Sequence, residues 1–284
     1  MLGARAALPL IDLARLGAQT ALIIDAHIHV GDWDHPDFLG RRSTLQGTID
    51  VLESAGVSGA AVCPTDQCAN AALAREADEA LANGYTGKLW LFPWVRPITE
   101  DGPGASDLRY VEDNLATTCG VKIHPSLSRV RISDEGFAPI LELAHRRGLV
   151  VLVHCGRWQE IASYRFAVEA ATRYPGAKFL LAHAGGDTPP LATSAAELVA
   201  EKCVDNVWFE FSGLREFWVI ERNVSLLGAE RYLMGSDYAL AHPLMYIGAV
   251  AGMKLSEEQK DRILSGNALA LFGEPLARSA KVQG

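Results

Sequence analysis

Two histidines stand two residues apart near the start of the chain, in the stretch Leu22-Ile23-Ile24-Asp25-Ala26-His27-Ile28-His29. The apolar residues before Asp25 predict a strand that is buried on both faces, as in a parallel sheet. Because side chains of a strand alternate between its faces, we expect Asp25, His27 and His29 to share one face. Two neutral imidazoles placed in this way can hold zinc, iron or nickel. A hydrogen-bonded pair at a strand end is the alternative, so the pair alone favours a metal only slightly.

Most of the chain's eight histidines share one position, the carboxyl end of a predicted strand. These are His27, His29, His124, His154 and His183. His35 and His242 follow strands in loops, where we expect rim positions, and His145 lies on a predicted helix. Histidines scattered through a core or over a surface would not gather at one end of the strands. The pattern therefore indicates a converging site more strongly than any single position does.

Two charged residues also stand at the ends of apolar runs. Asp237 ends the last predicted strand, and a buried carboxylate there needs a cation or several hydrogen-bond donors. Lys122 lies two residues before His124 and on the same face of its strand. A buried lysine is costly unless it is neutralised, paired, or converted to a carbamate, which would be an anionic ligand bridging two metals. The alternative is an ion pair with Asp25 or Glu210.

Eight apolar runs alternate with eight helical segments and would carry these residues. The runs span residues 22–29, 57–63, 89–95, 120–124, 149–154, 178–183, 207–211 and 231–237. Such alternation predicts parallel βαβ units, and eight units in this length predict a closed (β/α)8 barrel, with its chemistry at the carboxyl ends of the strands. No Gly-x-Gly-x-x-Gly follows the first run, which removes the main argument for an open dinucleotide-binding sheet. We expect residues 1–284 to form one domain, with a short amphipathic helix within Met1–Thr20 and helices at the C-terminus.

Composition limits the class of protein. The chain has 284 residues, is 49% hydrophobic and 21% charged, and is typical of a soluble globular protein. A net charge of −8 argues against general nucleic-acid binding, and no apolar run reaches the roughly 20 residues that a membrane span needs. The five cysteines are scattered without Cys-x-x-Cys spacing, which indicates reduced thiols in a cytoplasmic protein. A homo-oligomer is an open possibility, because no residue pattern sets the oligomeric state.

The ordered set of polar strand ends resembles the amidohydrolase superfamily. It consists of Asp25-x-His27-x-His29, Lys122, His154, His183 and Asp237. The stretches Val153-His154-Cys155-Gly156 and His183-Ala184-Gly185-Gly186 are most similar to the amidohydrolase-related branch. That branch includes aminocarboxymuconate-semialdehyde decarboxylase and lactone hydrolases. The resemblance covers nearly the whole chain and implies a metal-dependent barrel enzyme.

The resemblance implies two plans for the metal. In the mononuclear plan, the ligands are His27, His29, His154 and Asp237, and His183 acts as an acid/base group beside the metal-bound water. In the binuclear plan, Lys122 is carboxylated, and His154 and His183 bind a second metal. The stretch 121–125, Val-Lys-Ile-His-Pro, resembles the lysine-bearing strand of dihydroorotases. One divalent metal or two are therefore expected, with zinc as the default.

The main functional hypothesis is hydrolysis of a small amide, lactone or ester. A bound divalent metal can lower the pKa of its water to roughly 7. We expect Asp237 to accept the water proton and to pass it to the leaving group, assisted by His183. His124, Arg96 and Arg157 are expected to bind the substrate, the arginines through a carboxylate. The alternatives are a metal-dependent decarboxylase of an unsaturated or aromatic carboxylate and a ligand-binding barrel without catalysis.

Overall fold

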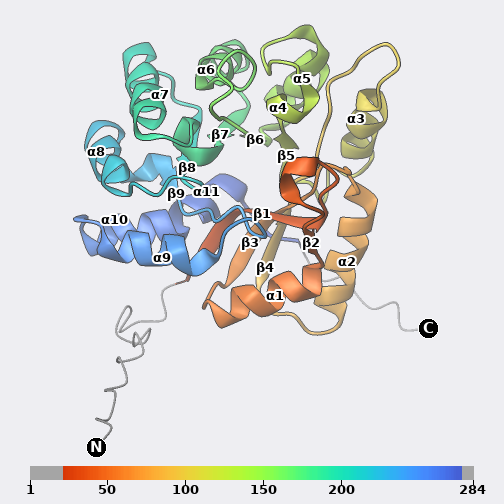
Figure 1. The fold of residues 1–284 in the computed structure, drawn as a ribbon. Helices are drawn as coiled ribbons and strands as arrows, with labels where there is room; N and C mark the ends of the chain where they lie inside the picture. Colours follow the sequence, from red (N-terminus) through yellow and green to blue (C-terminus); the bar gives the residue numbers. More distant parts are fainter. Residues whose placement is uncertain (1–21, 277–284) are drawn as a thin grey trace, which may run out of the picture.

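The computed structural model describes residues 22–276, and eight parallel strands in this range form a closed barrel (Figure 1). The strands are β1 (Ile24–Asp32), β3 (Gly59–Pro64), β4 (Lys88–Leu91), β5 (Gly120–Ile123), β6 (Val150–Val153), β7 (Lys178–Leu181), β8 (Val207–Glu210) and β9 (Tyr232–Leu233). β1, β3 and β4 pair in order, and so do β5 to β9. Bridges between Trp94 and Lys122 and between Ile28 and Tyr238 close the two remaining seams. The (β/α)8 barrel predicted from the sequence is confirmed.

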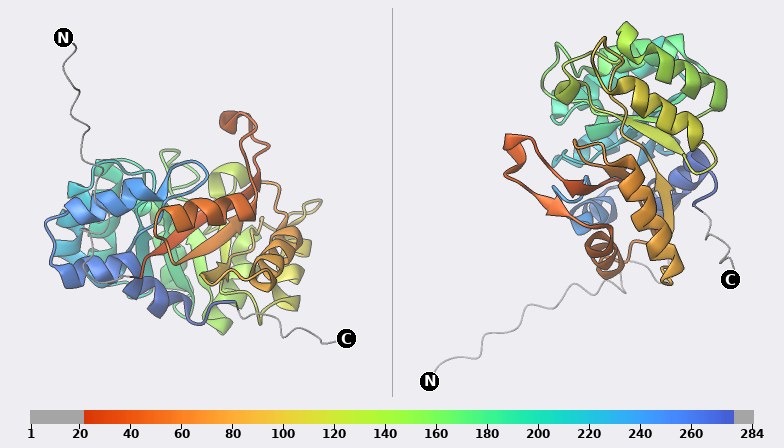
Figure 2. Two further views of the ribbon diagram at one scale, coloured as in Figure 1. Left: turned by 90° about the horizontal axis from the view of Figure 1, so that it is seen from below. Right: turned by 90° about the vertical axis from the view of Figure 1, so that its right-hand side faces the viewer.

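Helices follow the strands and surround the barrel. They are α1 (Leu45–Ser54), α2 (Asn70–Ala82), α3 (Gly104–Asp113), α4 (Pro125–Ser128), α5 (Ala138–Arg147), α6 (Tyr164–Arg173), α7 (Pro189–Lys202), α8 (Trp218–Leu227), α9 (Pro243–Gly252), α10 (Glu257–Asp261) and α11 (Asn267–Phe272). α6 shows why such segments are helical, because Tyr164, Ala167, Val168 and Ala171 recur at helical spacing and are all buried. The short β2 (Arg42–Ser43) pairs antiparallel with β1, and the segment around it projects beyond the barrel (Figure 2).

A bulge in β1 changes which of its side chains point into the barrel. Asp25 is opposite Ala60 of β3, but Ile28 is opposite Val62, so β1 contains one extra residue. Ile24 and Ala26 accordingly pack in the interior cluster with Ala61 and Trp90. Ile28 and Val30 pack in the outer cluster with Leu45 and Ile49 of α1.

The expected common face for Asp25, His27 and His29 is therefore wrong for Asp25. Since its neighbours Ile24 and Ala26 both point inward, Asp25 points away from the interior. The extra residue then restores an inward direction to His27 and His29, whose rings meet inside the barrel. Alternation by two holds only while the ladder is regular, and a single bulge reverses it.

Several boundaries differ from those read along the sequence. α9 was not predicted, because Pro-Leu-Met-Tyr-Ile-Gly-Ala-Val-Ala-Gly is apolar on every side and has no helical polar period. α8 begins at Trp218, only seven residues after the predicted strand that ends at residue 211. β9 is two residues long and ends at Leu233, before Asp237. The helix expected within Met1–Thr20 lies outside the described residues, and the single domain over 1–284 stays a prediction.

No helix between residues 22 and 276 is long and apolar enough to cross a membrane.

Candidate metal centre

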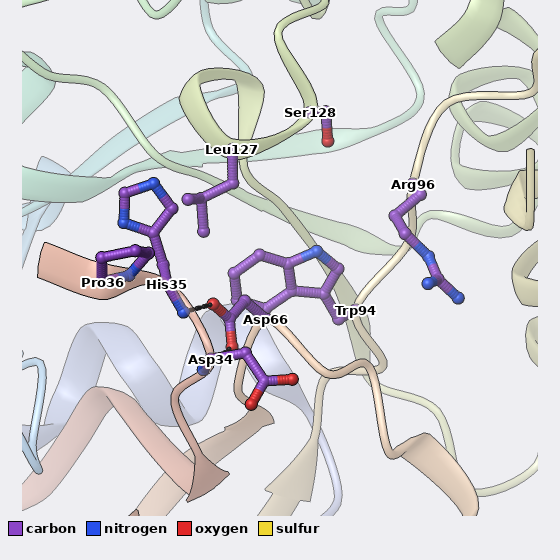
Figure 3. Close-up of a pocket in the computed structure, with 8 residues that line it drawn as sticks. All are labelled: Asp34, His35, Pro36, Asp66, Trp94, Arg96, Leu127 and Ser128. Carbon is purple, nitrogen blue, oxygen red and sulfur yellow. Dashed lines mark hydrogen bonds between the residues drawn. The ribbon is translucent and has the colours of Figure 1, made fainter. Parts of the chain in front are cut away.

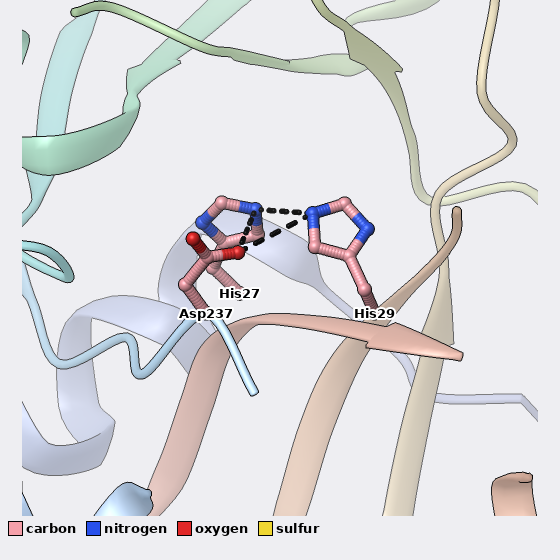
Figure 4. Close-up of side chains that lie close together, drawn as sticks. All are labelled: His27, His29 and Asp237. Carbon is pink, nitrogen blue, oxygen red and sulfur yellow. Dashed lines mark hydrogen bonds and ion pairs between the residues drawn. The ribbon is translucent and has the colours of Figure 1, made fainter. Parts of the chain in front are cut away.

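Three side chains meet where β1 and the segment after β9 lie side by side (Figure 4). The Nε2 atoms of His27 and His29 are 3.0 Å apart. Asp237 Oδ1 lies 3.5 Å from His27 Nε2 and 3.4 Å from His29 Nε2. Two atoms bound to one ion at about 2.1 Å, with an angle of 90–109° between them, are about 3.0–3.4 Å apart. We call these three residues the metal triad.

The hydrogen bonds at Nδ1 of both rings direct their Nε2 lone pairs toward the triad. His29 Nδ1 lies 2.8 Å from the carbonyl oxygen of Pro64, which can only accept a hydrogen bond. His27 Nδ1 lies 2.9 Å from the Glu210 carboxylate and also donates. In a neutral ring the proton is then on Nδ1, and a lone pair remains on Nε2. Burial, and then the charge of Lys122, lowers the pKa of both rings well below the usual value.

These residues therefore fit a divalent metal. Two Nε2 lone pairs and a carboxylate oxygen converge on one point, and the triad is the only group of three such ligand atoms within 4.8 Å that residues 22–276 contain. Facing lone pairs at 3.0 Å repel one another unless a cation or a proton lies between them. Two nitrogens and one carboxylate oxygen are a set that zinc, manganese and iron accept.

His154, which the resemblance implies is a ligand, lies beside the triad and not within it. Its Nδ1 is 3.1 Å from His183 Nε2, and its ring stacks on His124 with centroids 3.9 Å apart. His183 Nδ1 lies 2.9 Å from the carbonyl oxygen of Ser212 and therefore donates to it. Its Nε2 is then the acceptor for the His154 Nδ1 proton. His183, the predicted acid/base group, and His154, the predicted ligand, thus share one proton.

Two site residues hold uncommon backbone conformations. His183 has φ 58° and Asp237 has φ 57°. Both lie in the left-handed region that residues other than glycine rarely occupy. The Asp237 backbone N–H donates to the carbonyl of His27 at 2.7 Å, which fixes the turn against β1. Burial raises the pKa of Asp237 to about 6. Such positions cluster at functional sites, where the surrounding structure maintains them.

Lys122 is buried inside the barrel next to the triad. Its Nζ lies 2.8 Å from His27 Nε2. Burial is the main cause that lowers its pKa. Within the described range, no carboxylate oxygen lies within ion-pair distance of Nζ, so the expected alternative of a pair with Asp25 or Glu210 is wrong. Both acids instead accept hydrogen bonds from neutral groups.

Glu210 is a site residue that the sequence suggested only as a partner for Lys122. It ends β8, is fully buried, and contacts His27, His183 and Ser212. The available signal was a carboxylate inside the apolar run Val-Trp-Phe-Glu-Phe, at residues 207–211. That signal does not predict the partners of Glu210, because His27 comes from β1 and His183 from the chain after β7.

Asp25 joins β1 to the segment after β9, next to the triad. Its Oδ1 accepts the backbone N–H of His27 at 3.2 Å and that of Ser236 at 2.9 Å. Burial raises its pKa from 3.8 to about 7. Asp25 thus holds the backbone of His27 and of Ser236, the residue before Asp237, without entering the triad.

An Asp25→Asn variant is expected to remove one pH dependence of stability. Because the folded-state pKa of Asp25 is raised, its contribution is present below pH 4 and is lost as the pH rises through about 7. From pH 5 to pH 8, the unfolding free energy of the wild type relative to the variant should fall by about 2–3 kcal/mol. Urea unfolding of both proteins with chelator present measures this difference, and parallel pH profiles would contradict it.

The predicted substrate-binding residues lie around the mouth of the barrel. Arg96 donates through Nε and Nη2 to the two oxygens of Asp107, at 2.7 and 2.8 Å. The Asp107 carboxylate thus binds the Arg96 guanidinium through two hydrogen bonds. Arg157 is largely exposed and pairs with Asp187 at 2.9 Å. His124 lies between Trp94 and His154 in a stack of rings. The site thus includes His124, whereas both arginines already have acidic partners.

A pocket of about 400 Å³ opens beside this stack (Figure 3). It is lined by Asp34, His35, Pro36, Asp66, Trp94, Arg96, Leu127 and Ser128. The Trp94 ring also lies 5.8 Å from the His29 ring, so it borders both the pocket and the triad. Asp66 accepts the backbone N–H groups of Asp34 and His35, which holds the loop after β1 over the pocket.

Comparisons with known proteins agree with the fold. A 5-carboxyvanillate decarboxylase from Sphingomonas paucimobilis is 17% identical with a TM-score of 0.65, over 89% of this chain and 99% of that one. A dihydroxybenzoic acid decarboxylase from Polaromonas, with bound manganese and 2-nitroresorcinol, is 16% identical with a TM-score of 0.62, over 88% and 96%. An uncharacterised TIM-barrel protein from Bordetella bronchiseptica is 15% identical with a TM-score of 0.67, over 88% and 97%. At these identities the likeness shows the fold alone.

No curated protein matches the chain. A family model described as amidohydrolase matches residues 24–273, a range that begins with β1 and includes every member of the metal triad. The chain therefore belongs to the amidohydrolase family.

Proposed function

We propose that this chain is a metal-dependent decarboxylase that removes carbon dioxide from a small, flat, unsaturated or aromatic carboxylate. The observation that carries the proposal is a wall of parallel rings beside the metal triad. Trp94 and His124 stack at 5.4 Å and 6°, and His124 and His154 stack at 3.9 Å and 12°. Flat rings favour flat partners, because offset stacking maximises their contact. Two of the similar structures are named as decarboxylases of aromatic acids, which supports the same substrate class.

The residues supply what this reaction needs. The bond between the ring carbon and the carboxylate breaks, carbon dioxide leaves, and the carbon that keeps the electron pair takes up a proton. A divalent metal held by the triad would supply a Lewis acid for the oxygens of the substrate. Asp237 and His183 are the proposed proton carriers, and His183 Nε2 can receive a proton from His154 Nδ1 across 3.1 Å. The rings and the buried interior beneath them exclude water.

Hydrolysis is the second candidate, and Lys122 is the observation that favours it. Its Nζ lies 2.8 Å from His27 Nε2 and has no carboxylate partner in the part of the chain described. A carbamate on Nζ could bind a second metal together with His154 and His183, whose facing nitrogens are 3.1 Å apart. Two metals are an arrangement suited to activating water. The predicted zinc would serve either reaction, as would manganese, which one similar structure contains.

The test is a product assay of the purified protein loaded with Zn²⁺ or Mn²⁺. Hydroxybenzoates and unsaturated diacids form one panel, and lactones, esters and amides form the other, both in ¹⁸O-labelled water. We expect carbon dioxide release, with a product that lacks one carboxylate and carries no ¹⁸O. A product containing ¹⁸O without carbon dioxide release would establish hydrolysis instead. Absence of stoichiometric metal would favour a non-catalytic barrel.

A further inference from the structure

Glu210 accepts hydrogen bonds from four donors inside the barrel, and the reaction proposed above does not use it directly. Its Oε1 lies 2.9 Å from His27 Nδ1, 3.1 Å from the backbone N of His183 and 2.9 Å from Ser212 Oγ. Its Oε2 accepts the backbone N–H of Ser212 at 2.8 Å. A carboxylate has about four lone-pair sites in total, so it can accept all four hydrogen bonds, although three of the donors share Oε1.

The first of these hydrogen bonds controls the tautomer of His27. Because a carboxylate only accepts, the proton of the neutral ring stays on Nδ1, and Nε2 faces His29 Nε2 and Asp237 with a lone pair. Carboxylates behind metal-binding histidines act in this way, and their loss typically weakens metal binding 10–100-fold.

The second hydrogen bond holds the backbone of His183. This residue has φ 58°, a conformation that costs free energy unless the surroundings maintain it. Its backbone N–H donates to Glu210, while its ring Nδ1 donates to the carbonyl of Ser212, whose own N–H donates to Glu210. Glu210 thus holds His183 from both sides.

We propose that Glu210 is a positioning residue that sets the tautomer of His27 and the orientation of His183 at the same time. It acts through these two histidines and does not touch the substrate. The inference rests on the metal-dependent function proposed above. It also predicts that the charge of Glu210, and not only its shape, is required.

A glutamine has the same shape and exposes this requirement. If its amide oxygen faces His27 and His183, its NH₂ group meets the backbone N–H of Ser212, and two donors face each other. If the amide is turned over, NH₂ faces His27 Nδ1, which must then accept, and the ring proton moves to Nε2 inside the triad. Both orientations disturb the centre.

The test compares Glu210→Gln with Asp107→Asn. Asp107 is another buried acid, but its contacts are to Arg96 and not to the triad. We expect Glu210→Gln to weaken Zn²⁺ binding 10–100-fold in competition with a chromophoric chelator and to change the visible spectrum of bound Co²⁺. Asp107→Asn should leave both unchanged. Wild-type affinity and spectrum in a folded Glu210→Gln protein would overturn the proposal.

A measurement on the wild-type protein covers the case in which Glu210→Gln fails to fold. ¹⁵N NMR of the histidine rings in chelator-treated protein should show His27 protonated at Nδ1 and unprotonated at Nε2. A ring protonated at Nε2 would also overturn the proposal. If the wild type binds no stoichiometric metal, the proposed function fails instead, so the two failures are distinguishable.

Discussion

An Asp237→Asn variant is expected to lose at least about 10³-fold in kcat, because two functions are removed together. Of the three ligand atoms in the triad, Asp237 Oδ1 is the anionic one, and an amide oxygen binds a divalent metal more weakly. The amide also cannot take up or release the proton that the reaction moves. The left-handed backbone and the N–H bond to His27 do not depend on the carboxylate charge, so the fold should be retained.

Steady-state kinetics and metal content measure these two losses separately. The matched control is Asp205→Asn, because Asp205 is 97% exposed and lies before β8, away from the triad. It undergoes the same chemical change and should retain full activity. An Asp237→Asn protein that keeps both its metal and wild-type turnover would contradict the roles given to this residue.

A Lys122→Met variant is expected to gain stability while it loses activity by about 10²-fold or more. Removing an amino group from a fully buried position ends its desolvation cost, and methionine fills a similar volume. We expect the unfolding free energy of the metal-free protein to rise by about 1–4 kcal/mol, as when buried charges are replaced by apolar groups. Activity should fall because Nζ contacts His27 beside the metal position.

Urea unfolding with chelator and the product assay give the two readings. Lys178→Met is the control, since Lys178 is a half-buried lysine at the start of β7 whose Nζ donates to the carbonyl of Leu271, outside the site. It should leave activity unchanged. Wild-type activity in Lys122→Met would exclude a carbamate at Lys122 and would remove the main support for hydrolysis.

The sequence determined the barrel architecture and the end of the barrel at which the site lies. Apolar runs alternate with helical segments along the whole chain, which predicts a closed barrel. Such a barrel has only one end where the carboxyl termini of its strands meet. His27, His29 and Asp237 were therefore predictable as neighbours, although 208 or more residues separate Asp237 from the pair. The same geometry places His124, His154 and His183 at this end of the barrel.

Only the tertiary structure decided which partner each polar group has. The bulge in β1 put Asp25 on the opposite face from His27 and His29, because one extra residue in a ladder reverses the alternation of side chains. Arg96 is held by Asp107 of α3, Lys122 meets His27 rather than an acid, and Glu210 joins His27 to His183. Local periodicity places a side chain on a face, whereas a hydrogen bond requires an atom within about 3 Å from another strand. That closeness depends on register, twist and closure of the whole barrel, which no single stretch of sequence contains.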